Sequence, residues 1–323
     1  MNDGADLGRR LREGDRSAAP ATLNLLESTA ASDREQAAAL LAEVSPAKLA
    51  GEAPGHIIGV TGPPGAGKST LLSALLQSWR KRDQTVAMLA VDPSSRRSGG
   101  SLLGDRARIE FDPADSGVFI RSTAAGERLG GIAWGTRSAA RALAGAFDAV
   151  VIETVGVGQA ETEVADLADT VAVVVQPGSG DVLQFLKSGI MEIPDVLVVT
   201  KADLGQVAIN ARRDLSAALR SLGKRSTRVL AVSSLPPPAG IEELLDTFEE
   251  RWRELSQDGG RVLAERRLRT RRAGALSDFV VEHGECGLRA LGGRGAAERW
   301  LSEQDPGLDT QALSSQLEQR MHR

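Results

Sequence analysis

The chain has 323 residues, of which 41% are hydrophobic and 25% charged, and its formal net charge is −4 at pH 7. This composition is that of a globular protein with a sizeable core, built as two domains or as one large domain with appendages. The charge balance gives no reason to expect binding to nucleic acid or to an anionic membrane. A single cysteine, Cys286, excludes an intramolecular disulfide and a cysteine-based metal cluster.

The hydropathy pattern indicates neither export nor membrane insertion. Residues 1–16 lack the apolar segment of a secretory signal. No apolar stretch approaches the roughly 20 residues that a bilayer-spanning helix needs. We therefore expect a cytoplasmic protein that does not bind membranes.

Residues 1–54 are expected to form a helical N-terminal extension. Ser32 and Glu35 have capping-box spacing ahead of an Ala/Leu stripe, which predicts a helix over 32–44. The Gly/Pro-rich residues 51–55 then break the pattern.

Residues 55–257 are expected to form an α/β domain. Short apolar, β-branched runs alternate with helical patterns, which predicts a mostly parallel sheet covered on both faces. Ligands bind such sheets at the carboxyl ends of the strands. Strands are expected at 56–62, 85–92, 117–122, 148–154, 170–176, 195–200 and 227–234, and helices at 69–82, 135–147 and 241–255.

Residues 258–323 are expected to form a helical C-terminal extension. Six arginines fall within residues 261–272. They have two interpretations, the solvated face of a helix or a surface for a partner or a second copy of the chain.

A phosphate-binding loop follows the first expected strand of the α/β domain. The pattern G-x-x-x-x-G-K-S between a strand and a helix is a P-loop in its required context, and it predicts the P-loop NTPase fold. Its glycines let backbone amides reach phosphate oxygens, the lysine reaches the β- and γ-phosphates, and the serine hydroxyl serves Mg²⁺. The nucleotide-binding residues of this loop are Gly62, Pro63, Pro64, Gly65, Ala66, Gly67, Lys68, Ser69 and Thr70.

Three acids accompany the P-loop. Asp92 ends an expected strand, where an acid holds a metal or water, although a turn or helix-cap aspartate fits the position too. Asp105 follows in a Gly/Ser-rich loop. Glu153 ends another strand, and Gly156 lies where a γ-phosphate-sensing glycine of a nucleotide switch is expected.

The residues after Gly156 predict slow hydrolysis. Ras-like enzymes place a water-orienting glutamine directly after the sensing glycine. This chain has Val157 there, and Gln159 lies two residues further on. In the loop 176–189, Asp181 and Lys187 face either the phosphates or a partner, or they are a helix cap and a surface lysine.

The segment Thr200-Lys201-Ala202-Asp203 is expected to read the base. A carboxylate at Asp203 accepts both donors of guanine, and adenine cannot supply that pair. GTP-binding proteins usually have Asn in place of Thr200, so we expect weaker anchoring of the base or of the loop, with guanine preference kept. The segment Ser233, Ser234 and Leu235 is expected beside the guanine carbonyl.

These motifs resemble the MeaB/ArgK-type GTPases. The resemblance rests on "GVTGPPGAGKST", "LAVDPSSRRSGGSLLGDR", "IETVGVGQAETEVADLAD" and "KAD", and covers most of residues 56–250. It implies a magnesium site at Ser69, Asp92, Asp105 and Glu153, and a switch lysine at Lys187. Together with Lys68 and Gly156, Glu153 and Lys187 form the expected catalytic set.

The resemblance also implies a function. Such proteins are dimeric chaperones that couple GTP binding and hydrolysis to the loading, editing or protection of a cobalamin-dependent acyl-CoA mutase, methylmalonyl-CoA mutase being the usual client. The implied cofactor is Mg²⁺ with GTP or GDP. The implied homodimer contacts come largely from the C-terminal extension.

Three alternatives remain. A nucleotide-dependent kinase or ATPase linked to basic amino-acid transport is one, although Asp203 argues against ATP. A nickel-inserting GTPase needs a His- or Cys-rich ligand set, and His56, His283 and His322 are dispersed. A scaffold with a vestigial site conflicts with the intact Lys68 and Ser69.

Overall fold

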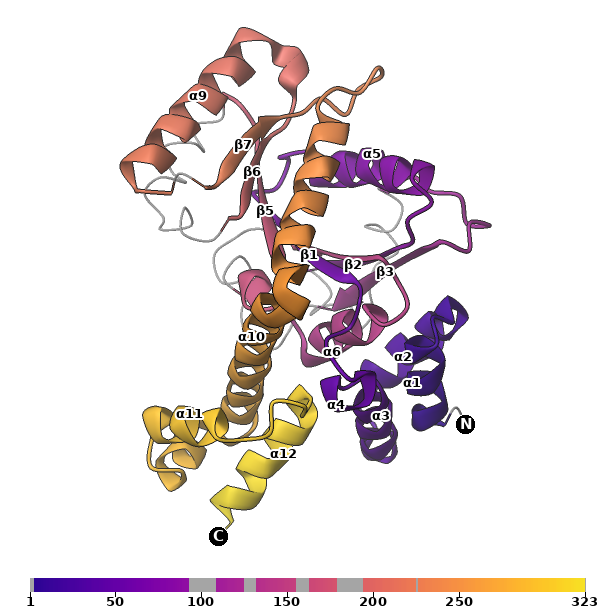
Figure 1. Ribbon diagram of the computed structural model, residues 1–323, viewed down its shortest axis with the longest axis vertical. Helices are drawn as coiled ribbons and strands as arrows, with labels where there is room; N and C mark the ends of the chain where they lie inside the picture. Colours follow the sequence, from indigo (N-terminus) through magenta and orange to yellow (C-terminus); the bar gives the residue numbers. More distant parts are fainter. Residues whose placement is uncertain are drawn as a thin grey trace. The chain divides into compact units, whose positions relative to one another are not determined.

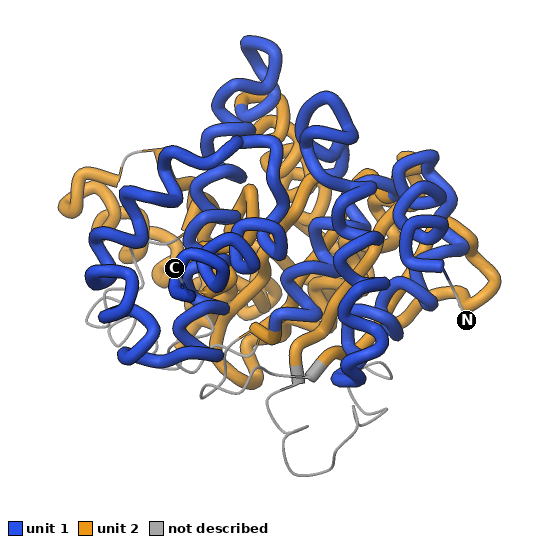
Figure 2. The backbone as a smooth tube through the Cα atoms, turned by 90° about the horizontal axis from the view of Figure 1, so that it is seen from below, with its two compact units in different colours: residues 1–55, 134–146, 255–323 blue, residues 56–133, 147–254 orange. Residues whose placement is uncertain are grey.

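The computed structural model describes residues 3–92, 109–124, 132–154, 163–178, 194–224 and 226–322. The chain forms two compact units, shown in Figure 2. Unit 1 comprises residues 1–55, 134–146 and 255–323, and unit 2 comprises residues 56–133 and 147–254. The N-terminal and C-terminal extensions therefore belong to the same unit, together with one helix from the middle of the chain.

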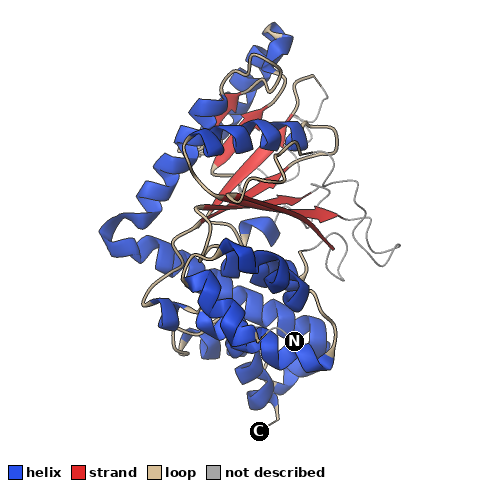
Figure 3. Ribbon diagram, turned by 90° about the vertical axis from the view of Figure 1, so that its right-hand side faces the viewer, coloured by secondary structure: helices blue, strands red, loops and turns tan. Residues whose placement is uncertain are grey.

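Unit 2 is built on a seven-stranded sheet whose described pairings are all parallel. Figure 3 shows these strands in red as one sheet. The strand order is β3-β2-β4-β1-β5-β6-β7, which confirms the predicted fold class. The bounds are β1 (His56–Thr61), β2 (Val86–Asp92), β3 (Val118–Ala124), β4 (Ala149–Thr154), β5 (Thr170–Val175), β6 (Val196–Val199) and β7 (Arg228–Ala231).

Continuous apolar strands form this sheet because helices bury both of its faces. Every residue of β1, β5 and β6 is buried. Helix α5 (Lys68–Lys81) packs on β2, and α9 (Gln206–Ser221) packs on β6 and β7, as Figure 1 shows. The rings of Trp79 from α5 and Phe248 stack at 6.3 Å in the core.

Polar contacts fix the first residues of β1, the strand that leads into the P-loop. The ring of His56 stacks on Trp252 at 4.8 Å, and its Nε2 lies 2.8 Å from the hydroxyl of Thr170. The backbone N–H of Ile57 donates to a carboxylate oxygen of Asp169. The start of the central strand is thereby tied to the start of its neighbour, β5.

The N-terminal part of unit 1 consists of short helices. They are α1 (Gly4–Arg12), the 3₁₀ helix η1 (Arg16–Ala18), α2 (Ala19–Leu26), α3 (Ala31–Glu43) and α4 (Pro46–Leu49); α2 packs on α6 (Trp134–Leu143). The capping-box prediction is wrong, because α3 begins at Ala31 and Ser32 lies in its first turn. Ser28 fixes the entry instead: its hydroxyl donates to Asp33 and accepts from the N–H of Ala30.

The C-terminal part of unit 1 begins within a long helix, α10 (Ile241–Ala290), followed by α11 (Arg294–Ser302) and α12 (Thr310–Met321). Helical geometry is lost at residues 257–260, where Asp258, Gly259 and Gly260 have positive φ, and again at Gly284. The predicted boundary between residues 257 and 258 therefore falls at a kink, after which α10 resumes. No described helix has the length and apolarity needed to cross a membrane.

A second hydrophobic core lies among these C-terminal helices. Phe279 is its largest fully buried side chain. The buried members come from α10, α11, α12 and the turn between α10 and α11: Ala275, Leu276, Phe279, Val280, Leu288, Leu291, Ala297, Leu301, Leu313 and Leu317. The C-terminal extension thus has a core of its own.

Two arginines of the Arg-rich stretch are neither solvated nor on a free surface. Arg267 is buried, and its guanidinium donates to the carbonyls of Ala53 and Gly55 at 2.6 and 2.7 Å. Arg271 is also buried and binds both carboxylate oxygens of Glu52 at 2.9 Å. Both interpretations drawn from sequence are therefore wrong for these two residues, which hold the 52–55 segment of their own chain.

Two half-buried arginines lie close by in unit 1. Arg137 forms an ion pair with Asp278, and Arg141 donates to the hydroxyl of Thr310. Burial, with the neighbouring charges of Arg271 and Arg137, lowers the pKa of Arg141 to about 10. Charges that are largely removed from water are stabilising only when they are paired and hydrogen-bonded, so the network requires its partners from α6, α10 and α12.

We expect Arg267→Ala to lower the free energy of unfolding by roughly 2–5 kcal/mol, because it leaves two buried carbonyls without a donor. Arg269→Ala, an exposed change on the same helix, should cost less than about 0.5 kcal/mol. Urea unfolding followed by circular dichroism measures both values. Equal stability of the two variants would contradict the anchoring role of Arg267.

Candidate nucleotide-binding site

The P-loop connects β1 to α5 with a backbone that requires glycine. Gly62 has a φ of 150°, and a Cβ there would lie 2.1 Å from the carbonyl oxygen of Val174 on β5. Gly67 caps α5 at a φ of 88°. Because β1 lies between β4 and β5, the loop emerges at the middle of the sheet's carboxyl edge, where α/β sheets bind ligands.

Lys68 is the first residue of α5, and 6% of its surface is exposed. Its ammonium group donates to the carbonyl of Gly62 at 2.7 Å and to that of Pro63 at 3.1 Å. The side chain of the lysine is therefore directed back toward the loop that precedes it. Its charge adds to the positive N-terminal end of α5, an arrangement that favours an anion such as a phosphate at this point of the fold.

Ser69 and Glu153 meet beside the P-loop. The Ser69 hydroxyl donates to a carboxylate oxygen of Glu153 at the end of β4, over 3.3 Å. β2 pairs with β4 and ends at Asp92, which is in register with Ala124 of β3. Hydroxyl and carboxylate oxygens are the ligands that Mg²⁺ prefers, so Ser69 and Glu153 fit a magnesium ion.

Several predicted site residues lie outside the described residues. They are Asp105 of the expected metal site, Gly156 with Val157 and Gln159 of the expected switch, and Asp181 and Lys187 of the third loop. The side chain of Asp92 is not described either. Their roles stay predictions.

Thr200, directly after β6, anchors the P-loop. Its buried hydroxyl donates to the carbonyl of Ala66 at 2.6 Å and approaches that of Val175 at 3.2 Å. The sequence predicts weaker anchoring of the base or of the loop than the usual asparagine gives. A threonine hydroxyl supplies a short hydrogen bond to the same loop, while its effect on base binding stays a prediction.

Lys201 has a left-handed backbone, with a φ of 54°. Its ammonium group donates to the side-chain oxygen of Gln176 at 2.6 Å and to the carbonyl of Gly65 at 3.4 Å. The stem of Lys201 is thus directed toward the P-loop, as expected for a lysine that covers a base. Gln176 is not among the site residues predicted from sequence, where it is the last residue of the expected strand 170–176; in the structure it directly follows β5.

Asp203 lies in a short 3₁₀ turn, η4 (Ala202–Leu204), and one of its carboxylate oxygens accepts from the hydroxyl of Ser233 at 2.9 Å. Ser233 is buried, and two backbone hydrogen bonds of 2.9 Å join it to Ala239. Ser234 and the exposed Leu235 follow. The structure therefore brings Asp203 together with Ser233, and this pair is close to Lys201.

We expect Thr200→Val to weaken GTP binding roughly fivefold, because the loop loses one hydrogen bond worth about 1 kcal/mol. Thr200→Ser keeps the hydroxyl and should bind GTP like the unchanged protein. Titration with a fluorescent GTP analogue measures the three dissociation constants. Equal affinities for the valine and serine variants would contradict the anchoring role.

This geometry defines the class of protein. A parallel sheet with a glycine-rich loop at its central strand, a lysine at the following helix and an acid at the neighbouring strand end is the fold and site of a P-loop nucleotide-binding protein. The chain belongs to one family within that class. Residues 19–284 match the model of the methylmalonyl-CoA mutase-associated GTPase MeaB family, which confirms the resemblance seen in the sequence.

Relatives with names and structures agree with this assignment. A "Probable GTPase" of Mycobacterium tuberculosis is 42% identical over 269 residues, covering 81% of this chain and 78% of that protein. The mouse "Methylmalonic aciduria type A homolog, mitochondrial" is 37% identical over 257 residues, covering 74% and 61%. The crystal structure of a "LAO/AO transport system kinase" superposes with a TM-score of 0.67 at 26% identity, covering 100% and 99%.

Proposed function

We propose that the chain is a GTP-hydrolysing chaperone of a cobalamin-dependent acyl-CoA mutase, with methylmalonyl-CoA mutase as the client. GTP binding and hydrolysis would be coupled to loading, editing or protection of that enzyme. The proposal for the nucleotide rests on one observation: Asp203, held by Ser233, follows the carboxyl end of β6, and the P-loop lysine follows the carboxyl end of β1 in the same parallel sheet. The proposal for the client rests on family membership and on the name of the mouse relative.

The residues of the site have assigned roles in this proposal. Lys68 binds the β- and γ-phosphates, and the P-loop amides orient them. Ser69, Asp92, Asp105 and Glu153 would hold Mg²⁺, which neutralises charge that develops on the transferring phosphoryl group. Gly156 and Lys187 would respond to the γ-phosphate. We propose slow hydrolysis that the partner accelerates, because Val157 takes the place of a water-orienting glutamine.

We also propose that the protein works as a homodimer. The C-terminal extension carries the contacts between copies in this proposal, although Arg267 and Arg271 are already engaged within the chain. Sedimentation velocity of the full chain tests the proposal. A single species with the mass of one chain, at all concentrations and nucleotide states, would exclude it.

The test of function is GTP turnover by the purified chain, alone and with the mutase of the same organism, with ATP as the control. Slow turnover of GTP only, raised by the mutase, is the expected result. If the mutase leaves GTP turnover unchanged, the chain is a GTPase but the mutase is not its client. Turnover of ATP instead would favour the second candidate, a nucleotide-dependent kinase or ATPase of basic amino-acid transport, which the similarity to the transport system kinase brings into consideration.

A further inference from the structure

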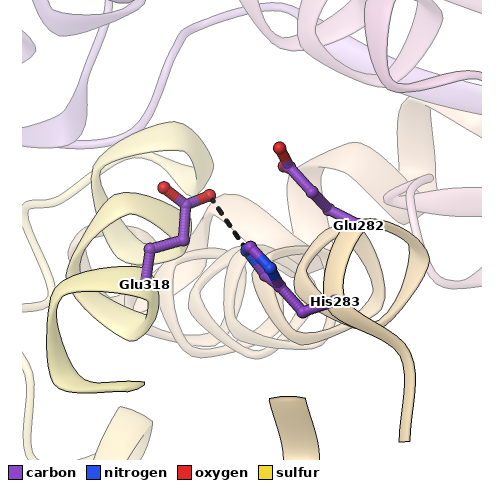
Figure 4. Close-up of side chains that lie close together, drawn as sticks. All are labelled: Glu282, His283 and Glu318. Atoms are coloured by element: carbon purple, nitrogen blue, oxygen red, sulfur yellow. Dashed lines mark ion pairs between the residues drawn. The ribbon is translucent and has the colours of Figure 1, made fainter. Parts of the chain in front are cut away.

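Three potential metal ligands meet between two helices of unit 1. Glu282 and His283 belong to α10, and Glu318 belongs to α12. One ligand atom from each residue lies within 4.8 Å of those of the other two. Figure 4 shows the imidazole of His283 directed toward Glu318, with Glu282 beside it on the same helix. The cluster takes no part in the nucleotide site described above.

The imidazole of His283 has an unusual environment for a surface histidine. Its Nε2 is buried and has no hydrogen-bond partner. The nearest carboxylate oxygen, from Glu318, lies at 3.8 Å, which is beyond hydrogen-bonding range. The ring also packs against Phe279, with a centroid distance of 4.7 Å. His283 and Glu318 thus form a long ion pair without a hydrogen bond, and a cation between them would bind both atoms directly.

The spacing is close to that of a metal site. Ligand atoms about 2.1 Å from a tetrahedral zinc ion lie about 3.4 Å from one another. The observed distance of 3.8 Å between His283 Nε2 and the Glu318 carboxylate oxygen exceeds this value by only about 0.4 Å, which small side-chain rotations can close. Glu282 is exposed, so its carboxylate can turn toward the same point without disturbing the core.

We propose that Glu282, His283 and Glu318 bind one divalent transition-metal ion of the zinc class. One imidazole and two carboxylates favour Zn²⁺ or Co²⁺ over Mg²⁺ and Ca²⁺, which prefer oxygen ligands alone. Water completes the coordination. The bound ion joins α10 to α12 and stabilises the C-terminal helices, because it binds only when both helices are folded.

The test uses Co²⁺ as a spectroscopic probe on the full chain, without nucleotide. Tetrahedral Co²⁺ with a nitrogen ligand absorbs visible light strongly, whereas Co²⁺ at an all-oxygen octahedral site absorbs weakly. We expect one equivalent of Co²⁺ to produce the strong bands and Zn²⁺ to displace it. His283→Ala and Glu318→Gln should each weaken binding more than about tenfold.

Glu285→Gln serves as the matched control, because this exposed glutamate lies on the same helix and outside the cluster. It should bind Co²⁺ like the unchanged protein, and so should His322→Ala near the C-terminus. Strong bands that persist in His283→Ala would place the ion elsewhere and overturn the proposal. Absence of the bands from the unchanged chain, or their loss in His283→Ala but not in Glu318→Gln, would overturn it as well.

Discussion

Replacing Lys68 by alanine is expected to lower the rate of GTP turnover at least about a hundredfold. This is the typical loss when one preorganised hydrogen-bond donor that stabilises a transition state is removed. The lysine is buried at the start of α5 and is held over the P-loop by the carbonyls of Gly62 and Pro63. No other residue of the loop carries a positive charge. GTP affinity should fall with turnover, since the ammonium group is expected to contact the phosphates of the bound nucleotide.

Lys81→Ala is the control for this prediction. Lys81 lies in the last turn of the same helix and is exposed, so its removal takes away one charge without touching the loop. Phosphate release and equilibrium titration with GTP measure the two variants. If GTP affinity is unchanged in Lys68→Ala, the P-loop assignment is wrong.

Replacing Asp203 by asparagine is expected to lower GTP affinity at least about a hundredfold, because two hydrogen bonds to a charged carboxylate are each worth about 1.5–3 kcal/mol. The ATP affinity of the variant should equal that of the unchanged protein, so its affinities for GTP and ATP become more alike. Xanthine has a carbonyl where guanine has its exocyclic amine, and the N–H groups of the asparagine amide can donate a hydrogen bond to that carbonyl. XTP should therefore bind the variant more tightly than the unchanged protein.

Asp214→Asn removes an exposed carboxylate of α9, one oxygen of which lies 3.6 Å from Nε of Arg213. It is the matched control, and its GTP and ATP affinities should equal those of the unchanged chain. Competition titrations with GTP, ATP and XTP measure all three proteins. Asp203 does not read the base if the variant still prefers GTP over ATP by the original factor.

The strand pattern and the P-loop could be predicted from sequence because both are local. Apolar runs of a buried parallel sheet and the spacing from Gly62 to Ser69 are visible in the chain itself. The anchoring bond from Thr200 to Ala66 was not predictable in the same way, because it joins segments 134 residues apart. Only the pairing of β6 beside β5, and β5 beside β1, brings the two together.

The Arg-rich stretch shows the same limit. Charge patterning predicts that a run of arginines faces solvent or a partner. Arg267 and Arg271 instead bind carbonyls and a carboxylate that lie more than 200 residues earlier in the chain. The histidines give a further example. His283 is isolated in sequence, and the packing of α12 on α10 supplies the glutamate that completes its cluster.

The hydrogen bonds from Thr200 and Lys201 to the carbonyls of Ala66 and Gly65 have a consequence for the free energy of nucleotide binding. These bonds join the segment that is expected to read the base to the loop that is expected to hold the phosphates. Whichever end of the nucleotide arrives first orders part of the surface that the other end needs, so the second contact costs less entropy. Guanosine and inorganic triphosphate, offered as separate molecules, should therefore bind cooperatively, each raising the affinity for the other.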